Sequence, residues 1–333
     1  MTPVAFLYLS QQEVIDAGFT LKEAIDIVED VFKEHGLKKF ENPPKPGVHP
    51  RDDAFIHAMP GYLPRKGAVG LKWVSGYPSN PQHGLPLIMG LIVLNDVNTG
   101  QPIAVMDGAY ITALRTAAAS GVAAKYLANQ NAKVIGIVGA GVQGRYNLLA
   151  LNEALPGIQV ARVFDTNESA LQQFVESMSK VVPFPVEAAQ TAAEVIQGAD
   201  IVVTATGKLD KPVFKEKWVT EGALVLPVHT AGWEPRTLHQ VDKFIVDDWQ
   251  QFSQTLGQPG GFYMPLPDLY AELGEIVTHK KPGRESKSER IINFNFGIAI
   301  HDVAVASVVF ARAKEKGIGT KLNLTDGELP LSP

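Results

Sequence analysis

Cysteine is absent from the 333 residues of the chain. This absence excludes disulfide bonds and thiolate chemistry, and it favours a cytoplasmic enzyme. Long apolar runs are also lacking, because no stretch reaches the length of a membrane span. The chain start, Met1-Thr-Pro-Val-Ala, has neither a basic segment nor a cleavage site of a secretory signal. We therefore expect a cytoplasmic protein with no membrane partner.

The chain has no excess of positive charge. Its formal net charge is −5 and its pI is about 5.9, so nothing attracts the whole molecule to nucleic acid. No G-x-S-x-G motif, Walker motif or nucleic-acid module is present either. Hydrophobic residues make up 45% and charged residues 20%, which is ordinary for a globular protein long enough for two domains. An anionic substrate must therefore be held by local cations.

A glycine-rich stretch, Lys133 to Arg145, carries the strongest signal. It joins an apolar run to the pattern G-x-G-x-x-G at Gly139, Gly141 and Gly144. In such a strand-to-helix turn, the first glycine permits the tight bend and the second lets a pyrophosphate approach the backbone. The third glycine lets the helix pack closely, and Val142 and Gln143 open that helix with free N–H donors. The pattern predicts a dinucleotide site.

An acid at the end of the next predicted strand specifies the cofactor. Asp165 follows Val160–Phe164 and is placed to bind the hydroxyls of an adenosine ribose. The same acid repels a 2′-phosphate, and the next residues, beginning with Thr166, include no cation, so we predict NAD rather than NADP. Thr204, Ala205 and Thr206 follow another predicted strand and are further cofactor candidates. The alternative is a glycine-rich turn that binds no cofactor.

From Lys133 onward, predicted strands alternate with predicted helices, which indicates an α/β fold with a Rossmann-type doubly wound parallel sheet. The first part of the chain is instead rich in strands, and it ends in an Ala-rich helix from about Ala109 to Asn129. A short helix is expected at Leu266–Leu273. The last expected helix, Gly297 to Lys316, has no predicted strand after it.

Two cations lie in unusually apolar surroundings. Lys72 stands in the strand pattern Gly70–Ser75, and Arg115 opens the Ala-rich helix. A buried cation needs an anion, and a substrate carboxylate is a suitable one. Arg115 can hold it with two hydrogen bonds, whereas Lys72 is a point charge suited to proton transfer. The alternative for both is a solvated surface charge.

Other polar residues have weaker signals. Lys45 follows two prolines and is either a third substrate-binding cation or a solvated loop residue. His229 and Glu234 come just after a predicted parallel strand, so they point to the cofactor edge or serve a structural loop. His301 and Asp302 lie near the start of the last helix, where capping explains an acid. The histidines show no metal-ligand spacing, and we predict no metal.

Several segments together resemble the ornithine cyclodeaminase/μ-crystallin family over nearly the whole chain. They are Gly70-Leu-Lys-Trp-Val-Ser75, Asp96-Val-Asn-Thr-Gly-Gln-Pro102, Met106 to Ser120 with its Thr-Ala-Leu-Arg-Thr-Ala-Ala core, Gly139 to Arg145, and Gly297-Ile-Ala-Ile-His-Asp302.

The resemblance implies two domains. Residues 126–296 would form the NAD-binding Rossmann domain. Residues 1–125 and 297–333 would form a second, α+β domain built from both chain ends, which binds substrate and makes a homodimer through its sheet. The shared chemistry is hydride transfer between a nicotinamide and the C–N carbon of an amino or imino acid. The positions of Lys72 and Arg115 would grip the substrate carboxylate, with Lys45 in place of an assisting Arg and Gly297 in the substrate site.

The chain departs from the family pattern in the loop after the strand at Ala223–Val228. Cyclodeaminases carry there an Asp that contacts the side-chain amine of ornithine, but this chain has His229-Thr-Ala-Gly-Trp-Glu-Pro. Glu234 can replace the Asp only if the loop shifts. His301 in place of a Glu and Asn295 in place of a Ser also indicate an altered substrate pocket.

These observations predict an NAD-dependent amino-acid dehydrogenase or imine reductase. Lys72 and Arg115 would be catalytic and substrate-binding residues, Glu234 a further catalytic candidate, and Lys45, His229 and Gly297 substrate-binding residues. One alternative is an ornithine cyclodeaminase-type enzyme that recycles NAD. Another is a nicotinamide- or small-ligand-binding protein without catalysis. The sequence does not name the amino or imino acid.

Overall fold

The computed structural model describes residues 3–207, 209–229, 231–257 and 262–325. The chain divides into two compact units. The antiparallel unit consists of Met1–Thr20, Lys39–Thr112 and Ala299–Pro333, and the parallel unit consists of Leu21–Lys38 and Ala113–Ile298. Both chain ends therefore belong to one unit, and the other unit is formed mainly by the middle of the chain. Within the described residues, no helix is long and apolar enough to cross a membrane.

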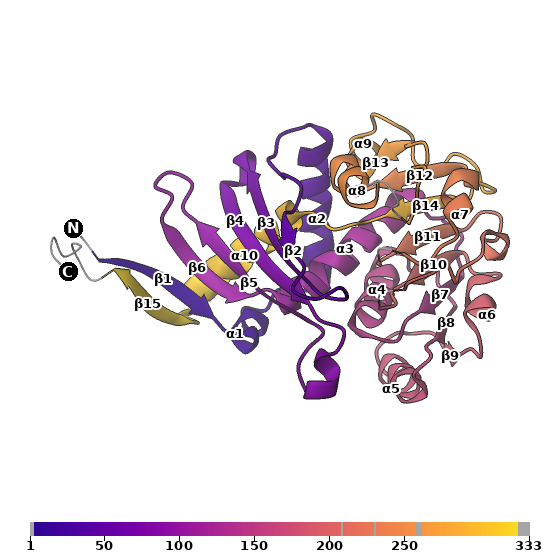
Figure 1. Cartoon of the computed structure of the whole chain (residues 1–333), viewed down its shortest axis with the longest axis horizontal. Coiled ribbons are helices and arrows are strands. Elements are labelled where there is room, and N and C mark those ends of the chain that lie inside the picture. Colours follow the sequence, from indigo (N-terminus) through magenta and orange to yellow (C-terminus); the bar gives the residue numbers. More distant parts are fainter. Residues whose placement is uncertain (1–2, 208, 230, 258–261, 326–333) are drawn as a thin grey trace. The chain divides into compact units, whose positions relative to one another are not determined.

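The antiparallel unit is built on a seven-stranded sheet with the order β15-β1-β6-β5-β4-β3-β2 (Figure 1). All neighbouring strands are antiparallel except β1 and β6. The strands are β1 (Val4–Leu9), β2 (Gly47–Val48), β3 (Phe55–Leu63), β4 (Ala68–Gly76), β5 (Ile88–Asn95), β6 (Pro102–Asp107) and β15 (Thr320–Thr325). The short helices are α1 (Gln11–Asp16), η1 (Pro64–Lys66) and η2 (Asn80–His83).

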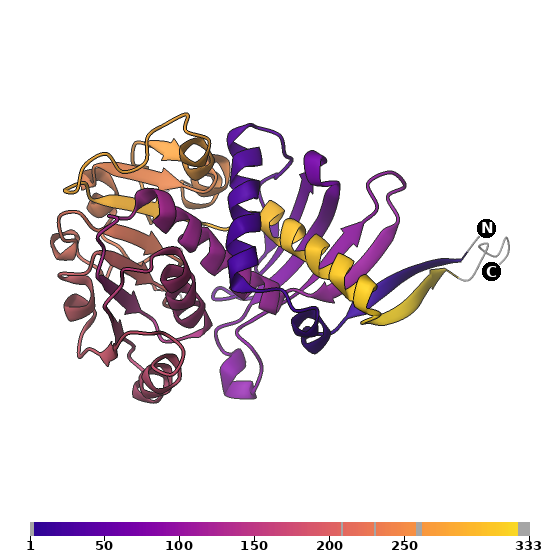
Figure 2. The same ribbon diagram turned by 180° about the vertical axis from the view of Figure 1, so that it is seen from behind.

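Helix α10 (Ala299–Lys316) covers one face of this sheet, as Figure 2 shows from behind. Side chains alternate between the two faces of a strand. In β4, Lys72 and Val74 are buried, whereas Trp73 between them is exposed on the other face. At Gly61 on β3, an added Cβ would lie 3.1 Å from the backbone nitrogen of Ile300. The absence of a side chain there lets the start of α10 approach the sheet closely.

The parallel unit contains an eight-stranded sheet, and every pair of neighbouring strands in it is parallel. Its order is β13-β12-β14-β11-β10-β7-β8-β9. The strands are β7 (Val134–Val138), β8 (Val160–Phe164), β9 (Val186–Ala188), β10 (Ile201–Thr204), β11 (Leu224–Pro227), β12 (Lys243–Val246), β13 (Ala271–Glu272) and β14 (Ile291–Phe294). The chain runs outward from β7 to β9 and then returns to β10, so the strand order reverses between β7 and β10. This confirms the predicted doubly wound sheet.

The helices associated with this sheet are, in chain order, α2 (Leu21–Gly36), α3 (Ala109–Leu127), α4 (Val142–Ala154), α5 (Glu168–Met178), α6 (Ala192–Ile196), η3 (Glu216–Trp218), α7 (Pro235–Gln240), α8 (Trp249–Leu256) and α9 (Leu273–Val277). Helix α2 belongs here although it lies early in the chain, because it packs on α9 and α4. An added Cβ at Gly36 would lie 2.0 Å from the carbonyl oxygen of Gly274. The compact units therefore divide the chain differently from the expected boundaries at 125/126 and 296/297, since α2 and most of α3 join the middle of the chain.

Two expectations about elements were wrong. Leu266–Leu273 is not a helix, because Pro267 restricts the preceding residue to extended backbone; α9 begins instead after the capping box of Glu272 and Glu275. A strand does follow the last helix: β15 pairs antiparallel with β1 at the edge of the sheet. All six residues of β15 are exposed, so no burial pattern marks it in the sequence.

Candidate functional site

The glycine-rich turn joins β7 to α4 in the parallel unit. Gly139 has a φ of +113°, and a Cβ there would lie 2.4 Å from the carbonyl oxygen of Ala205. A Cβ at Gly144 would lie 2.0 Å from the carbonyl oxygen of Gly139, so α4 meets the turn without room for a side chain. At Gly141, by contrast, an added Cβ would meet nothing within 4 Å. The backbone at Gly141 is thus open to a ligand.

The start of α4 leaves its N–H groups available. Gly141 is the N-cap and has no side chain to accept a hydrogen bond, and Val142 is 60% exposed. A helix of 13 residues begins here, so its dipole favours an anion at this end. Gly139, Gly141, Val142, Gln143 and Gly144 together have the open cradle that a dinucleotide pyrophosphate requires. The residues present therefore fit NAD.

Asp165 follows β8, next to this turn. Its Oδ2 accepts a hydrogen bond of 2.7 Å from the backbone nitrogen of Ala140, and its Oδ1 accepts one of 2.8 Å from Asn167. The carboxylate thus fixes the glycine-rich turn, and each oxygen keeps a lone pair for a ribose hydroxyl. Thr166 is partly exposed beside it. This arrangement fits the predicted ribose contact.

Two threonines at the end of β10 and just after it have different surroundings. Thr204 is fully buried, and its hydroxyl oxygen lies 2.7 Å from Nε2 of His229 and 3.1 Å from Nε1 of Trp233. It therefore holds the loop after β11 rather than presenting its hydroxyl to a ligand. Thr206 differs, because its buried hydroxyl oxygen has no hydrogen-bond partner. Ala205 lies against the first glycine of the turn, so Thr206 is the better placed candidate for the cofactor.

His229 is held inside this loop. Its ring lies 5.7 Å from that of Phe214, centre to centre, and burial lowers its pKa to about 4. A neutral imidazole bonded to Thr204 is a loop-fixing group. Glu234 lies at the start of α7, where it accepts a hydrogen bond of 3.1 Å from the backbone nitrogen of Glu216 and forms an ion pair with Arg236. The Glu216 backbone hydrogen bond lowers the pKa of Glu234. These contacts give both residues structural roles, and their catalytic or substrate-binding roles stay predictions.

Lys72 lies inside the antiparallel unit, where its side chain is 1% exposed. Its Nζ lies 2.7 Å from Oδ1 of Asp302 and 3.3 Å from the hydroxyl oxygen of Thr112. Asp302, from α10, is fully buried. Sequence reasoning gave Asp302 only a capping role, since nothing in the local pattern reveals a partner on a distant strand. Lys72 and Asp302 thus form a buried ion pair between β4 and α10.

Arg115 lies on α3 in the parallel unit and is 7% exposed. An added Cβ at Gly297 would lie 2.9 Å from its Nη1, so the guanidinium packs against the Gly297 backbone. Gly297 has a φ of +91° and donates a 2.5 Å hydrogen bond to Asp247, which is fully buried. On the same helix, Thr112 stands one turn before Arg115, and residues three apart share a helix face. Thr112, whose hydroxyl lies near Lys72, and Arg115 therefore lie on the same face of α3.

A second cluster of ionisable groups occurs in the parallel unit. His35, Asp248 and Glu272 offer atoms within 4.8 Å of one another, a spacing compatible with a metal. Each has a structural partner, however. His35 Nε2 lies 3.2 Å from Asp248, whose other oxygen caps α8 through Gln251, and Glu272 accepts from Trp249. The three residues therefore help to hold α2 against the starts of α8 and α9.

Comparison with known proteins identifies relatives over nearly the whole chain. The family model "Ornithine cyclodeaminase/mu-crystallin family" matches residues 7–317. The nodulation efficiency protein NfeD of Rhizobium meliloti is 42% identical over 94% of this chain and 97% of its own length. An alanine dehydrogenase of Archaeoglobus fulgidus is 37% identical over 95% of this chain and 98% of its own.

Solved structures agree. The Δ1-pyrroline-2-carboxylate reductase of Thermococcus litoralis, in complex with NADH and L-proline, is 35% identical and superposes with a TM-score of 0.88. The match covers 95% of this chain and 99% of that one. An archaeal alanine dehydrogenase dimer with bound NAD is 36% identical, with a TM-score of 0.86, over 97% of this chain and 100% of that one. The chain belongs to the ornithine cyclodeaminase/mu-crystallin family.

Proposed function

We propose that the protein is an NAD-dependent oxidoreductase that acts on the C–N bond of a small amino or imino acid. The observation that carries this proposal is the open cradle at Gly141 beside Asp165, on a chain whose relatives include an alanine dehydrogenase and a pyrroline-2-carboxylate reductase. NAD, when bound, accepts or supplies the hydride. The protein must bind the substrate, orient it and hold a proton at its nitrogen.

Lys72 and Arg115 are the residues we assign to the substrate. Arg115, with its planar fork, binds the carboxylate through two hydrogen bonds. Lys72 holds a proton at Nζ, and Asp302 keeps that proton in place at a distance of 2.7 Å. Since the substrate nitrogen gains or loses a proton in the reaction, an ammonium inside the protein is a suitable exchange partner. Lys45, Gly297 and His229 are assigned to the surroundings of the substrate.

A substrate panel tests the proposal. Purified protein is mixed with NADH and with 2-keto acids plus ammonia or methylamine, or with preformed cyclic imines, and absorbance of the reduced nicotinamide is followed. Oxidation of NADH with one of them supports the proposal. Ammonia release from ornithine without net NADH change would assign a cyclodeaminase reaction instead. Binding of NADH with no turnover of any compound would leave a nicotinamide-binding protein.

Replacing Arg115 by Ala should raise KM for the carboxylate substrate about 100-fold, because two charge-assisted hydrogen bonds are lost. The dissociation constant of NADH should change less than threefold. Steady-state kinetics and NADH fluorescence titration measure the two effects. An unchanged KM would remove Arg115 from the carboxylate site.

Replacing Asp165 by Ala should relax the preference for NAD. The acid that binds ribose hydroxyls and repels a 2′-phosphate is then gone, so the ratio of kcat/KM for NADH over NADPH should fall at least tenfold. Because Asp165 also fixes Ala140, Asp165→Asn is the matched variant that keeps an acceptor at the turn. An unaltered cofactor ratio in both variants would contradict the ribose role.

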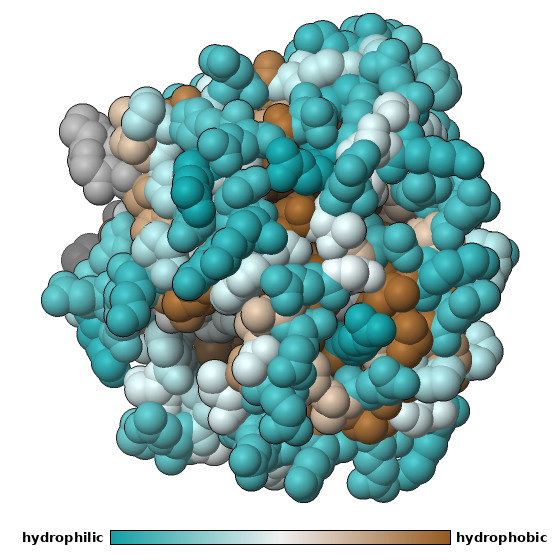
Figure 3. Space-filling view, turned by 90° about the vertical axis from the view of Figure 1, so that its right-hand side faces the viewer, coloured by the Kyte–Doolittle hydropathy of each residue, from teal (hydrophilic) through white to brown (hydrophobic). Residues whose placement is uncertain are grey.

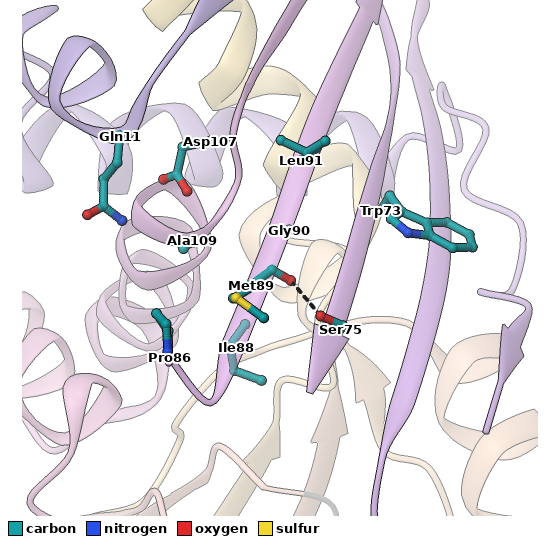
Figure 4. Close-up of a pocket in the computed structure, with 10 residues that line it drawn as sticks. All are labelled: Gln11, Trp73, Ser75, Pro86, Ile88, Met89, Gly90, Leu91, Asp107 and Ala109. Atoms are coloured by element: carbon teal, nitrogen blue, oxygen red, sulfur yellow. Dashed lines mark hydrogen bonds between the residues drawn. The ribbon is translucent and has the colours of Figure 1, made fainter. Parts of the chain in front are cut away.

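One face of the antiparallel sheet supports the inference of a homodimer. It is the face opposite α10, and Trp73, Leu91 and Tyr8 on it are 47%, 45% and 38% exposed. Trp73 and Leu91 are directly paired across β4 and β5. They line a hollow of about 390 Å³ together with Met89, and Gln11, Ser75 and Asp107 also line it. Figure 4 shows these residues. An apolar face of this kind marks an interface. The face of the molecule seen in Figure 3 is instead mostly hydrophilic, with scattered apolar residues.

We infer that two copies associate through this sheet, and the similar archaeal alanine dehydrogenase, which is a dimer, supports this inference. Trp73→Glu should convert the dimer to a monomer, because it places an unpaired charge in an apolar interface. Sedimentation velocity measures the mass. Val181→Glu, at a residue 59% exposed in the parallel unit, is the control and should leave the mass unchanged. A monomeric parent protein would contradict the inference.

A further inference from the structure

The antiparallel unit carries two histidines, His49 and His57, to which the proposed function gives no role, and they lie near Lys45, which it assigns only to the surroundings of the substrate. His57 lies on β3, and its ring stacks on Phe55 at 4.4 Å between centres. His49 meets the same ring edge-on at 6.2 Å. Lys45 stands two residues before β2, the strand that pairs with this part of β3. We call Lys45, His49 and His57 the His57 edge.

The sheet register places the His57 edge on the same face as Lys72. Met59 is paired with Lys72, and His57, two residues earlier, is paired with Val74. Residues two apart on a strand point to the same face. The backbone nitrogen of Ala58 donates 2.9 Å to the carbonyl oxygen of Pro46, so the pairing of β2 with β3 continues toward Lys45. Lys45 therefore lies opposite Met59, and three neighbouring chain segments bring nitrogen groups to one face.

The glycine opposite His57 leaves room for the imidazole ring. Gly47 is its cross-strand partner, and a Cβ at Gly47 would lie 2.2 Å from Cδ2 of His57. The ring therefore leans across β2, over the glycine, between Phe55 and His49. Any other residue at position 47 would displace it. These contacts fix the position of the His57 ring on the sheet.

The field at His57 is positive. Burial and the positive charges of Lys45, His49 and Lys72 lower the pKa of His57 to about 4. A ring with this pKa is neutral at pH 7 and offers one N–H donor. An arriving anion would offset the repulsion from the neighbouring cations and raise the pKa again. The His57 edge is thus prepared for a negative group.

We propose that the His57 edge binds a second carboxylate, carried by the side chain of the substrate, so that the substrate is a dicarboxylic amino or imino acid. The inference rests on the proposed function, in which Arg115 binds the first carboxylate and Lys72 holds the proton at the substrate nitrogen. Met59 and Val74 form a small apolar cluster with Ala299. A substrate with a methyl or cyclic apolar side chain would need only such a cluster and no N–H donors beside it. The His57 edge beside that cluster therefore favours a substrate whose side chain is negatively charged.

Isosteric substrates that differ only in charge test this inference. Oxidation by NAD is measured for L-aspartate against L-asparagine, and for L-glutamate against L-glutamine, with L-alanine and L-proline alongside. We expect kcat/KM to be at least about tenfold higher for one acid than for its amide, a difference of about 1.4 kcal/mol. His57→Leu should bring that ratio close to one. His57→Gln, which keeps an N–H donor, should retain part of it.

Two controls separate folding from recognition. His239→Leu, at an exposed histidine of the parallel unit, should leave the acid-to-amide ratio unchanged. Binding of succinate to the NAD-loaded protein, followed by calorimetry in two buffers of different ionisation enthalpy, should show proton uptake in the parent protein and less in His57→Gln. This readout does not depend on turnover.

The outcomes distinguish the two proposals. Turnover of alanine or proline with no preference for either acid over its amide, and no proton uptake with succinate, would overturn the dicarboxylate inference and leave the proposed function standing. A ratio that survives in His57→Leu would overturn the role of His57. No absorbance change with any amino acid or imine would overturn the proposed function, and the dicarboxylate inference with it.

Discussion

Lys72→Met should lower kcat about 10³-fold and also destabilise the protein. The activity is lost because the group that holds the proton at the substrate nitrogen is gone, and general acid–base groups typically contribute 10²–10⁴-fold. The stability falls because Asp302, fully buried, loses the ammonium group that lies 2.7 Å from its Oδ1. Removing one partner of a buried pair typically costs about 3–5 kcal/mol. Urea unfolding and steady-state kinetics measure the two effects separately.

The double variant Lys72→Met/Asp302→Asn separates stability from chemistry. With both charges removed, most of the lost free energy of unfolding should return, while kcat stays low. Lys22→Met, at an exposed lysine on α2, is the matched control and should alter neither quantity. If the double variant regained activity, Lys72 would be a structural residue, and its assignment to the substrate would fail.

Gly144→Ala should abolish NADH binding and destabilise the parallel unit by about 3 kcal/mol or more. The new Cβ would lie 2.0 Å from the carbonyl oxygen of Gly139 and 3.3 Å from Cγ2 of Ile137. The first contact is with backbone, so α4 must move away from the turn, and overpacking of this kind commonly costs about 1–3 kcal/mol even where side chains can yield. Thermal unfolding and NADH fluorescence titration report the two losses.

Gly141→Ala is the matched variant in the same turn. Nothing lies within 4 Å of its added Cβ, so the free energy of unfolding should stay within about 0.5 kcal/mol of the parent. NADH binding should nevertheless weaken about tenfold, because the methyl group occupies the approach of the pyrophosphate to the backbone. Equal NADH affinity in the parent and Gly141→Ala would contradict the placement of the phosphates at this turn.

The sequence by itself determined the parallel unit and its cofactor turn. The glycines at 139, 141 and 144, the strand before them and Asp165 after the next strand form a pattern within a short stretch of chain. Such a pattern is readable because each residue acts on its near neighbours: a turn needs a glycine, and a helix start needs free N–H groups. Local patterns of the same kind identified Lys72 and Arg115 as cations in apolar surroundings and predicted a strand-rich first part of the chain.

Only the tertiary structure decided the partners. Asp302 stands 230 positions from Lys72, and its place near a helix start made capping a sufficient explanation. Thr204 was expected at the cofactor, but folding turns its hydroxyl toward His229 and Trp233. The edge strand β15 has six exposed residues and is specified by its pairing with β1 rather than by burial. In each case the deciding interaction joins residues far apart in the chain, and a one-dimensional pattern records no such distance.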